Sequence, residues 1–146
     1  MRVHSMRGAG NFKNAVIRNE PHLSSALDRI PLDGIVTRDH LLGFVVEFQR
    51  AIAGRGGGSG ALATATRLLA MKRPDYFVCV DSKNRKGLCH AFLVPTSVTL
   101  DDYWESFCMR IQQAAWWLVP EPKGTLERSV WRGRAAFLDA LFYEPE

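Results

Sequence analysis

The chain has 146 residues, of which 47% are hydrophobic and 23% are charged, as expected for one folded domain. No run approaches the roughly 20 apolar residues of a membrane span, and the first ten residues lack the apolar region of a secretory signal. Three cysteines without a CxxC pair argue against a disulfide scaffold and a structural zinc site. We therefore expect a cytoplasmic protein that has no membrane contact, with residues 1–10 as a flexible leader and residues 11–146 as a single helical domain.

The net charge of +4 is unevenly distributed along the chain. Between Arg50 and Lys86 there are eight basic residues and two acidic ones, which gives this segment a charge of +6, whereas the stretch from Asp101 to residue 146 carries −3. Concentrated positive charge is typical of a surface that meets a polyanion. A solvated basic face without a partner would have the same composition.

The first predicted helices lie before the glycine-rich part of the chain. Pro21 is suited to the first turn of a helix, and apolar residues follow it at helical spacing as far as residue 30. Pro31 and Gly34 then interrupt the chain. Thr37 is a suitable N-cap for an amphipathic helix that extends to about residue 52.

The middle of the chain begins with the stretch 54–60, in which five of the seven residues are glycine. This composition predicts either a flexible tether or a tight backbone site. An apolar helix is expected at 61–71. The apolar segment Tyr76–Val80 has no convincing strand partner, so we predict an extended connector. Asp81 or Ser82 would then cap a short helix that ends near Phe92.

The last part of the chain predicts two more helices. Thr99 and Asp102 have the spacing of a capping box and would open a helix that ends near Trp117. Thr125 would cap the final helix. The apolar residues expected on or near one face of that helix are Val130, Trp131, Ala135, Phe137, Leu138 and Leu141. The elements together predict an all-α, compact domain of about six helices.

One series of features in the centre of the chain resembles a known family. Gly58, Ser59 and Gly60 open a helix of small residues, a proline turn follows, and an extended segment ends in Val80-Asp81. This order resembles the helix-hairpin-helix DNA glycosylase superfamily, in which a Gly-hydrophobic-Gly hairpin begins a helix that leads to a Val-Asp segment with the catalytic aspartate. The resemblance covers about residues 40–95 and implies a helix-hairpin-helix-like unit with Asp81 as its catalytic residue.

The resemblance also implies a partner and a reaction. DNA would be bound mainly through its phosphates, and the residues expected at that interface are Gly58, Ser59, Gly60, Arg67, Lys83, Arg85 and Lys86. A flipped base would enter a pocket beside Asp81, with stacking from Tyr76, Trp116 and Trp117. Asp81 would stabilise an oxocarbenium-like state or activate water in N-glycosidic hydrolysis, with no cofactor and no metal. Leu62 stands where lyase-type members carry a lysine, so the implied chemistry is that of a monofunctional hydrolase, with a role in DNA repair, defence or restriction.

Other interpretations remain open at this point. One alternative is that Asp81 caps a helix and has no catalytic role. Another is that the tryptophans are core residues, as tryptophans at helical spacing often are. Arg132 and Arg134 lie near the start of the predicted final helix, where the helix dipole disfavours positive charge. Their position indicates either an acidic partner or a surface Arg–Glu pair. The main alternative function is a non-enzymatic module that binds a protein through Trp-rich C-terminal helices, and a weaker one is a hydrolase of free nucleosides or nucleotides. Whether the chain is catalytically active is not decided by the sequence.

Overall fold

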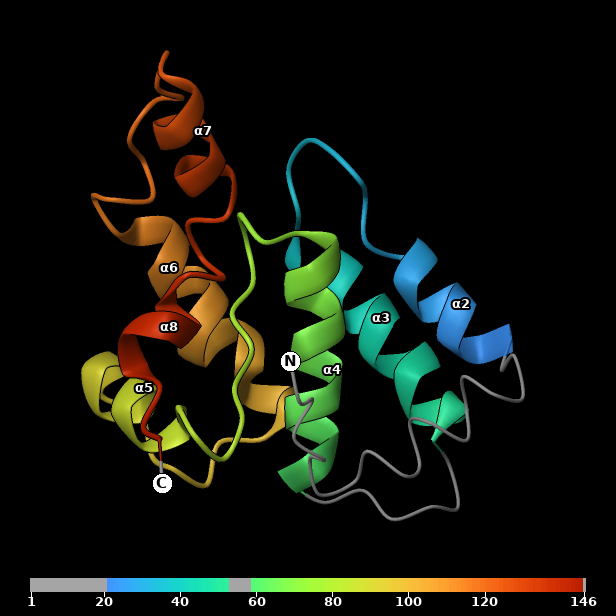
Figure 1. Ribbon diagram of the computed structural model, residues 1–146. Coiled ribbons are helices and arrows are strands. Elements are labelled where there is room, and N and C mark those ends of the chain that lie inside the picture. Colours follow the sequence, from blue (N-terminus) through green and yellow to red (C-terminus); the bar gives the residue numbers. More distant parts are fainter. Residues whose placement is uncertain (1–20, 53–58, 146) are drawn as a thin grey trace.

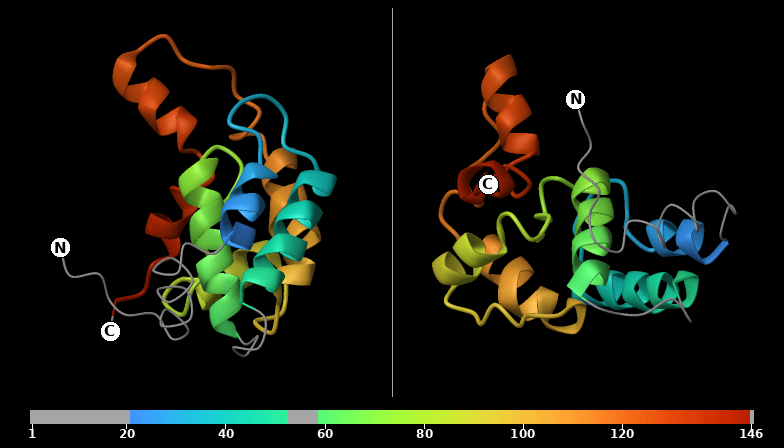
Figure 2. Two further views of the ribbon diagram at one scale, coloured as in Figure 1. Left: turned by 90° about the vertical axis from the view of Figure 1, so that its right-hand side faces the viewer. Right: turned by 60° about the horizontal axis from the view of Figure 1, so that its bottom comes forward.

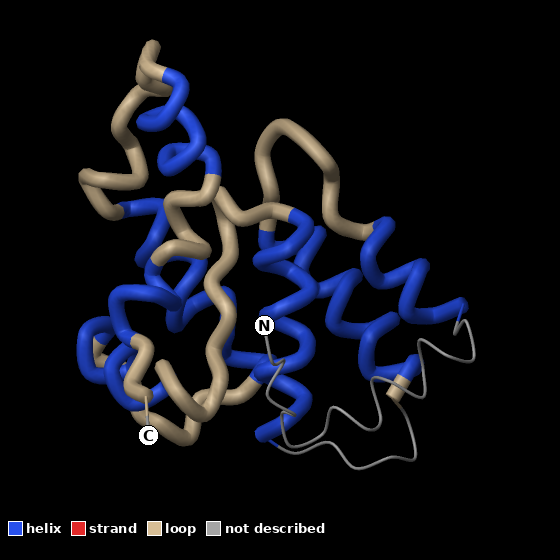
Figure 3. Tube along the Cα trace, viewed as in Figure 1, coloured by secondary structure: helices blue, strands red, loops and turns tan. Residues whose placement is uncertain are grey.

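The computed structural model describes residues 21–52 and 59–145. Within these ranges the chain folds into seven α-helices and no strand (Figures 1 and 3). The prediction of an all-α domain is confirmed, and the number of helices is close to the expected six. The expected leader at 1–10 and the glycine-rich residues 54–58 lie outside the described residues.

Helices α2 (Pro21–Asp28) and α3 (Arg38–Ala51) pack side by side as an antiparallel pair (Figure 1). Pro21 is the first residue of α2, as predicted. The predicted cap of α3 is also confirmed, because the Thr37 hydroxyl accepts the backbone N–H of His40 at 3.4 Å while His40 Nδ1 accepts the N–H of Thr37 at 3.0 Å. The histidine thus fills the position that a glutamate or glutamine has in the usual capping box.

Helix α4 (Ser59–Lys72) lies between the α2–α3 pair and the C-terminal helices (Figure 1). Its end is fixed by a buried arginine, Arg73, whose side chain is 7% exposed. The Arg73 guanidinium donates to both oxygens of Asp75 and to the carbonyls of Pro31 and Gly34, at distances of 2.8–3.0 Å. One arginine therefore ties the end of α4 to the loop between α2 and α3.

After α4 the chain returns alongside this helix as an extended segment (Figures 1 and 3). The segment has no strand partner among the described residues, and side chains satisfy its backbone groups instead. The buried Tyr103 hydroxyl donates to the Val78 carbonyl at 2.7 Å and accepts the Val78 N–H at 3.1 Å. Thr66 of α4 accepts the N–H of Val80 at 2.9 Å. The predicted extended connector is confirmed.

The helix predicted to run from Thr99 to Trp117 is shorter and less regular than expected. Its start is confirmed, because the N–H and hydroxyl of Thr99 both donate to Asp102 at 3.0 Å. Its predicted end is wrong, because Ala114 is already extended and the Trp117 indole turns to donate to the Asp75 carbonyl at 2.5 Å. The elements of this region are the 3-10 turn η1 (Leu100–Asp102), the π-helical turn η2 (Trp104–Cys108) and helix α6 (Met109–Gln113).

The predicted final helix is two helices, α7 (Thr125–Arg132) and α8 (Leu138–Phe142). The helix breaks after α7 because two backbone N–H groups beyond it donate outside the helix, to the Pro74 carbonyl at 2.9 and 3.1 Å. The prediction that Thr125 is the N-cap is wrong, since Gly124 holds that position. The prediction of a single apolar face is also wrong, because only Ala135 and Leu138 are buried among the six residues predicted to lie on it.

Helix α7 projects from the rest of the molecule in each view of Figures 1 and 2. It has no buried residue. It is held to the preceding loop by Arg128 and Arg132, which both pair with Glu121 at 3.3 Å, and by the Trp131 indole, which donates to the Val119 carbonyl. The surface Arg–Glu pair that the sequence left open for Arg132 is therefore present.

Candidate functional site

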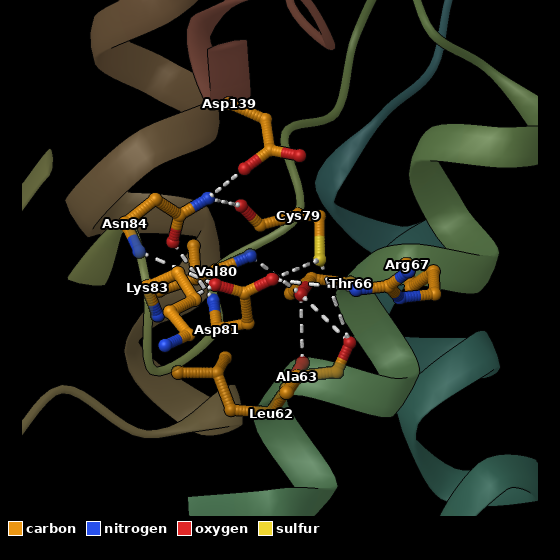
Figure 4. Close-up of polar contacts among 10 residues, drawn as sticks. All are labelled: Leu62, Ala63, Thr66, Arg67, Cys79, Val80, Asp81, Lys83, Asn84 and Asp139. Carbon is orange, nitrogen blue, oxygen red and sulfur yellow. Dashed lines mark hydrogen bonds and ion pairs between the residues drawn. The ribbon is translucent and has the colours of Figure 1, made fainter. Parts of the chain in front are cut away.

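Asp81 lies where the extended segment ends, beside α4 and before α5 (Arg85–Phe92) (Figure 4). Its carboxylate is 11% exposed. One oxygen, Oδ1, accepts the backbone N–H groups of Lys83 at 2.9 Å and Asn84 at 3.2 Å. The other oxygen, Oδ2, is 3.3 Å from a guanidinium nitrogen of Arg67 on α4. The carboxylate is therefore held in one orientation by groups from two elements.

The predicted capping role of Asp81 needs a correction. The N-cap of α5 is Asn84, not Asp81 or Ser82. The Asp81 side chain instead closes the turn before the helix, where its acceptor oxygen satisfies two N–H groups that the helix leaves unpaired. Asp81 is thus part of the helix entry, and one edge of its carboxylate, Oδ2, faces the exposed Arg67 rather than the backbone.

Asn84 connects Asp81 to a second acid that the sequence analysis did not identify, Asp139 of α8. The Asn84 side chain is fully buried. Its carbonyl oxygen accepts the N–H of Asp81 at 2.9 Å, and its amide nitrogen donates to the Cys79 carbonyl at 2.6 Å and to Asp139 Oδ1. Figure 4 shows Asp81 and Asp139 on either side of this amide. Burial raises the pKa of Asp139, and the nearby Asp81 adds to the effect, while the hydrogen bond from Asn84 and the charge of Arg67 oppose it.

The thiol of Cys79 completes this group of polar side chains, which we call the Asp81 centre (Arg67, Cys79, Asp81, Asn84 and Asp139). Its sulfur is 4.0 Å from Asp81 Oδ2 and 3.8 Å from the carbonyl of Ala63. Burial raises the pKa of Cys79 to about 11. Since the thiolate is the reactive form, Cys79 is a weak donor here and not a nucleophile at neutral pH.

The residues predicted to bind DNA are distributed unequally around the Asp81 centre. Ser59 and Gly60 begin α4, whereas Gly58 lies outside the described residues. Lys83 belongs to the turn that follows Asp81, and Lys86 is exposed on α5. Arg85 is directed inward instead, because its guanidinium donates to the Val98 carbonyl at 2.5 Å and its Nε is buried.

The aromatic residues predicted to stack on a base do not lie beside Asp81. Tyr76 is at the opposite end of the extended segment and is buried, with its ring 5.1 Å from that of Trp117 in an edge-to-face arrangement. Arg134 lies over the rings of both Trp117 and Trp131, at 4.6 and 4.1 Å. Trp116 is exposed. These residues form the attachment of the C-terminal region rather than a pocket at Asp81.

An open hollow of about 360 Å³ lies elsewhere, between the loop that follows α5 and the helical turns η1 and η2. Its lining residues are Pro95, Ser97, Val98, Asp102, Glu105 and Ser106. Two of the six are acidic and none is basic, so the hollow is unsuited to a phosphate.

The part of the chain that the structure describes has no group of three or more side chains arranged to hold a metal ion. Over the same residues, none of the helices combines the length and the apolar character needed to cross a bilayer. Comparisons of the chain with protein-family models, with curated proteins and with solved structures found no match.

Proposed function

We propose that the chain is a DNA-binding domain of the helix-hairpin-helix type and that the Asp81 centre hydrolyses an N-glycosidic bond. The observation that supports this most is the position of Asp81. A helix that starts at Ser59, an extended return along that helix and an aspartate at the entry to the next helix follow one another as the resemblance requires. The DNA backbone would lie across the start of α4 and the first turn of α5, with Lys83 and Lys86 as phosphate contacts.

The chemistry proposed for Asp81 follows from its fixed orientation. Cleavage of an N-glycosidic bond develops positive charge on the sugar, and a preorganised carboxylate stabilises that charge. The Asp81 carboxylate needs no reorganisation, because the two backbone N–H groups of Lys83 and Asn84 hold its Oδ1 whether or not Arg67 stays at Oδ2. Binding of DNA would displace Arg67 toward a phosphate, since its side chain is 46% exposed, and would leave Oδ2 facing the sugar.

DNA binding is tested by the salt dependence of duplex affinity. A side chain that contacts one phosphate contributes about 0.9 to the slope of log K against log salt, so Lys86→Gln should lower the slope by about that amount. Lys123→Gln is the matched control, because Lys123 is also an exposed lysine but lies before α7. Absence of duplex affinity at low salt, or equal slopes for the two variants, would refute the DNA interface.

Catalysis is tested with Asp81→Asn. The asparagine oxygen can still accept the N–H groups of Lys83 and Asn84, so the fold is retained, but the negative charge is lost. With duplexes that each carry one deaminated, oxidised or alkylated base, we expect base release by the unmodified chain on one class, loss of release in the variant by at least about 100-fold, and nearly unchanged DNA affinity. Equal release by both proteins would remove Asp81 from the reaction.

A second candidate function, binding of a protein partner, is favoured by the exposed face of α7. Leu126 and Val130 are one helical turn apart and are 76% and 50% exposed. The loop before α7 contacts the opposite side of the helix, through Arg128 and Arg132. An amphipathic helix normally buries its apolar side, so this arrangement fits an apolar helix of a protein partner laid against Leu126 and Val130.

The two candidates are separated by variants of α7. A photo-crosslinking residue at Ser129, which neighbours this face, should give one discrete cross-linked product in cells, and Leu126→Glu should abolish it. Glu127→Gln serves as the control on the same helix. Cross-linking that persists in Leu126→Glu would exclude the apolar face as the interface, and duplex affinity should be the same in all these variants.

A further inference from the structure

Asp139 reaches the Asp81 centre from a distant part of the sequence. It lies on α8, and the chain around it is attached to the entry of α5 at two further points: the N–H of Glu144 donates to the Lys83 carbonyl at 2.9 Å, and the Phe142 side chain packs against Gly87, where an added Cβ would approach it to 3.2 Å. The position of Asp139 is therefore fixed by the fold and not by one hydrogen bond.

The two carboxyl groups of the centre have different surroundings. Asp81 accepts two backbone N–H groups and pairs with Arg67. Asp139 accepts one hydrogen bond, at Oδ1 from Asn84, and its Oδ2 has no hydrogen-bond partner among the described residues. Two carboxyl groups with such unequal surroundings divide the roles of fixed charge and proton carrier in glycoside hydrolysis.

The charged and titratable groups around Asp139 come from three elements. They are Asp81 from the turn before α5, Arg67 from α4 and Cys79 from the extended segment. Lys83 directly precedes Asn84, and its backbone carbonyl accepts the N–H of Glu144 in the segment after α8. Burial and the Asp81 charge raise the pKa of Asp139, and the opposing effects of Asn84 and Arg67 are smaller than burial, so Asp139 takes up a proton more readily than an ordinary aspartate.

We infer that Asp139 is a second catalytic carboxyl group of the Asp81 centre and is the base that activates the attacking water. This inference rests on the proposed function. The water oxygen bonds to the sugar carbon, and the C–N bond breaks with its electron pair left on the base nitrogen. The proton lost by the water passes to Asp139 Oδ2 and from there to the departing base, so one water is consumed for each base released.

The first test uses no DNA. The pKa of Asp139 is measured by carbon-detected NMR of its carboxyl group in the unchanged chain and in Asp81→Asn. Because Asp81 raises the pKa of Asp139, removal of its charge should lower that pKa. A pKa of Asp139 that does not change would show that the two groups are not coupled, and would overturn the inference.

The second test uses the substrate class identified with the unchanged chain. Asp139→Asn keeps an oxygen acceptor for the Asn84 amide, so folding and duplex affinity should be retained, while single-turnover base release should fall about 100-fold or more. The decline of the rate at acid pH, where Asp139 becomes protonated, should disappear in this variant. A matched control is Asp101→Asn, which removes an exposed carboxylate outside the centre.

The outcomes separate the inference from the proposed function. If Asp139→Asn keeps the rate and pH profile of the unchanged chain while Asp81→Asn is inactive, Asp139 is not the base, but the proposed function stands. If the unchanged chain binds no DNA, or binds it and releases no base from any of the three lesion classes, the proposed function fails and the inference fails with it.

Discussion

Arg73 offers the most direct test of how this fold uses its positive charge. Replacement by methionine keeps most of the aliphatic stem and removes four hydrogen bonds, two to Asp75 and two to the carbonyls of Pro31 and Gly34. The two carbonyls and the Asp75 carboxylate, which is 23% exposed, would be left without these donors. Breaking a buried ion pair by removing one partner costs about 3–5 kcal/mol, so we expect the free energy of unfolding to fall by about 4 kcal/mol.

Urea denaturation followed by circular dichroism measures this change, since two-state unfolding is the usual behaviour of domains of this size. A loss of about 4 kcal/mol corresponds to a decrease in Tm of roughly 10 °C. Arg132→Met is the control, because that side chain is 66% exposed and pairs only with the exposed Glu121, so its effect should stay below about 1 kcal/mol. If Arg73→Met costs no more than Arg132→Met, the buried arginine does not hold α4 to the preceding loop.

Three further predictions concern stability. Tyr103→Phe should lower the free energy of unfolding by about 2–4 kcal/mol, because both backbone groups of Val78 lose a buried partner; a loss below about 1 kcal/mol would show that they find another one. Leu93→Gly should stabilise the chain by about 0.5–1 kcal/mol in urea denaturation, since Leu93 is 85% exposed and has a left-handed φ of 56°; a loss of stability would refute this reading of the turn. Asp139→Asn should raise Tm at pH 7, because the pKa of Asp139 is higher in the folded than in the unfolded chain and the ionised carboxylate therefore destabilises the fold at any pH above both pKa values. The difference in Tm between the two proteins should vanish as the pH falls below the unfolded pKa near 3.8, and a pH-independent difference in Tm would contradict the assignment.

Local sequence patterns sufficed where a local interaction determines the structure. The cap of α3 depends on Thr37 and His40, three residues apart, and the start of η1 depends on Thr99 and Asp102. Such contacts form within one turn of chain, so they are visible in the sequence. The extended connector was also predictable, because its apolar residues had no strand to pair with.

The errors occurred where a distant group competes with the local pattern. The helix expected to reach Trp117 ends early, since the Trp117 indole bonds to Asp75 about forty residues earlier in the chain. The final helix breaks because the Pro74 carbonyl accepts two N–H groups from the turn between α7 and α8. Neither acceptor can be recognised from helical periodicity, which reports only contacts between residues three or four apart.

The charge of the central segment shows why composition alone overstated the basic surface. At least five of its seven described cations are engaged with groups of the chain itself: Arg50 with Glu47, Arg67 with Asp81, Lys72 with the Leu27 carbonyl, Arg73 with Asp75 and Arg85 with the Val98 carbonyl. A count of charges treats all of them as available to a polyanion, whereas a buried guanidinium such as that of Arg73 contributes to the fold instead. The surface that could meet DNA is therefore narrower than the sequence indicates, and it centres on the turn at Asp81 and the first turn of α5.

The same reasoning explains why one half of the Asp81 centre was predictable and the other was not. Asp81 stands after a proline turn and an apolar segment, a pattern that marks the entry to a helix from the sequence alone. Asp139 stands within an apolar run, Leu138–Phe142, where a single acid is typical of the solvent-facing side of an amphipathic helix. Only the break of the final helix at the Pro74 carbonyl turns α8 back onto α5 and brings Asp139 to Asn84. A site built from both acids thus depends on a tertiary contact, and a substitution that lets α7 and α8 join into one helix should separate the two carboxyl groups without changing either of them.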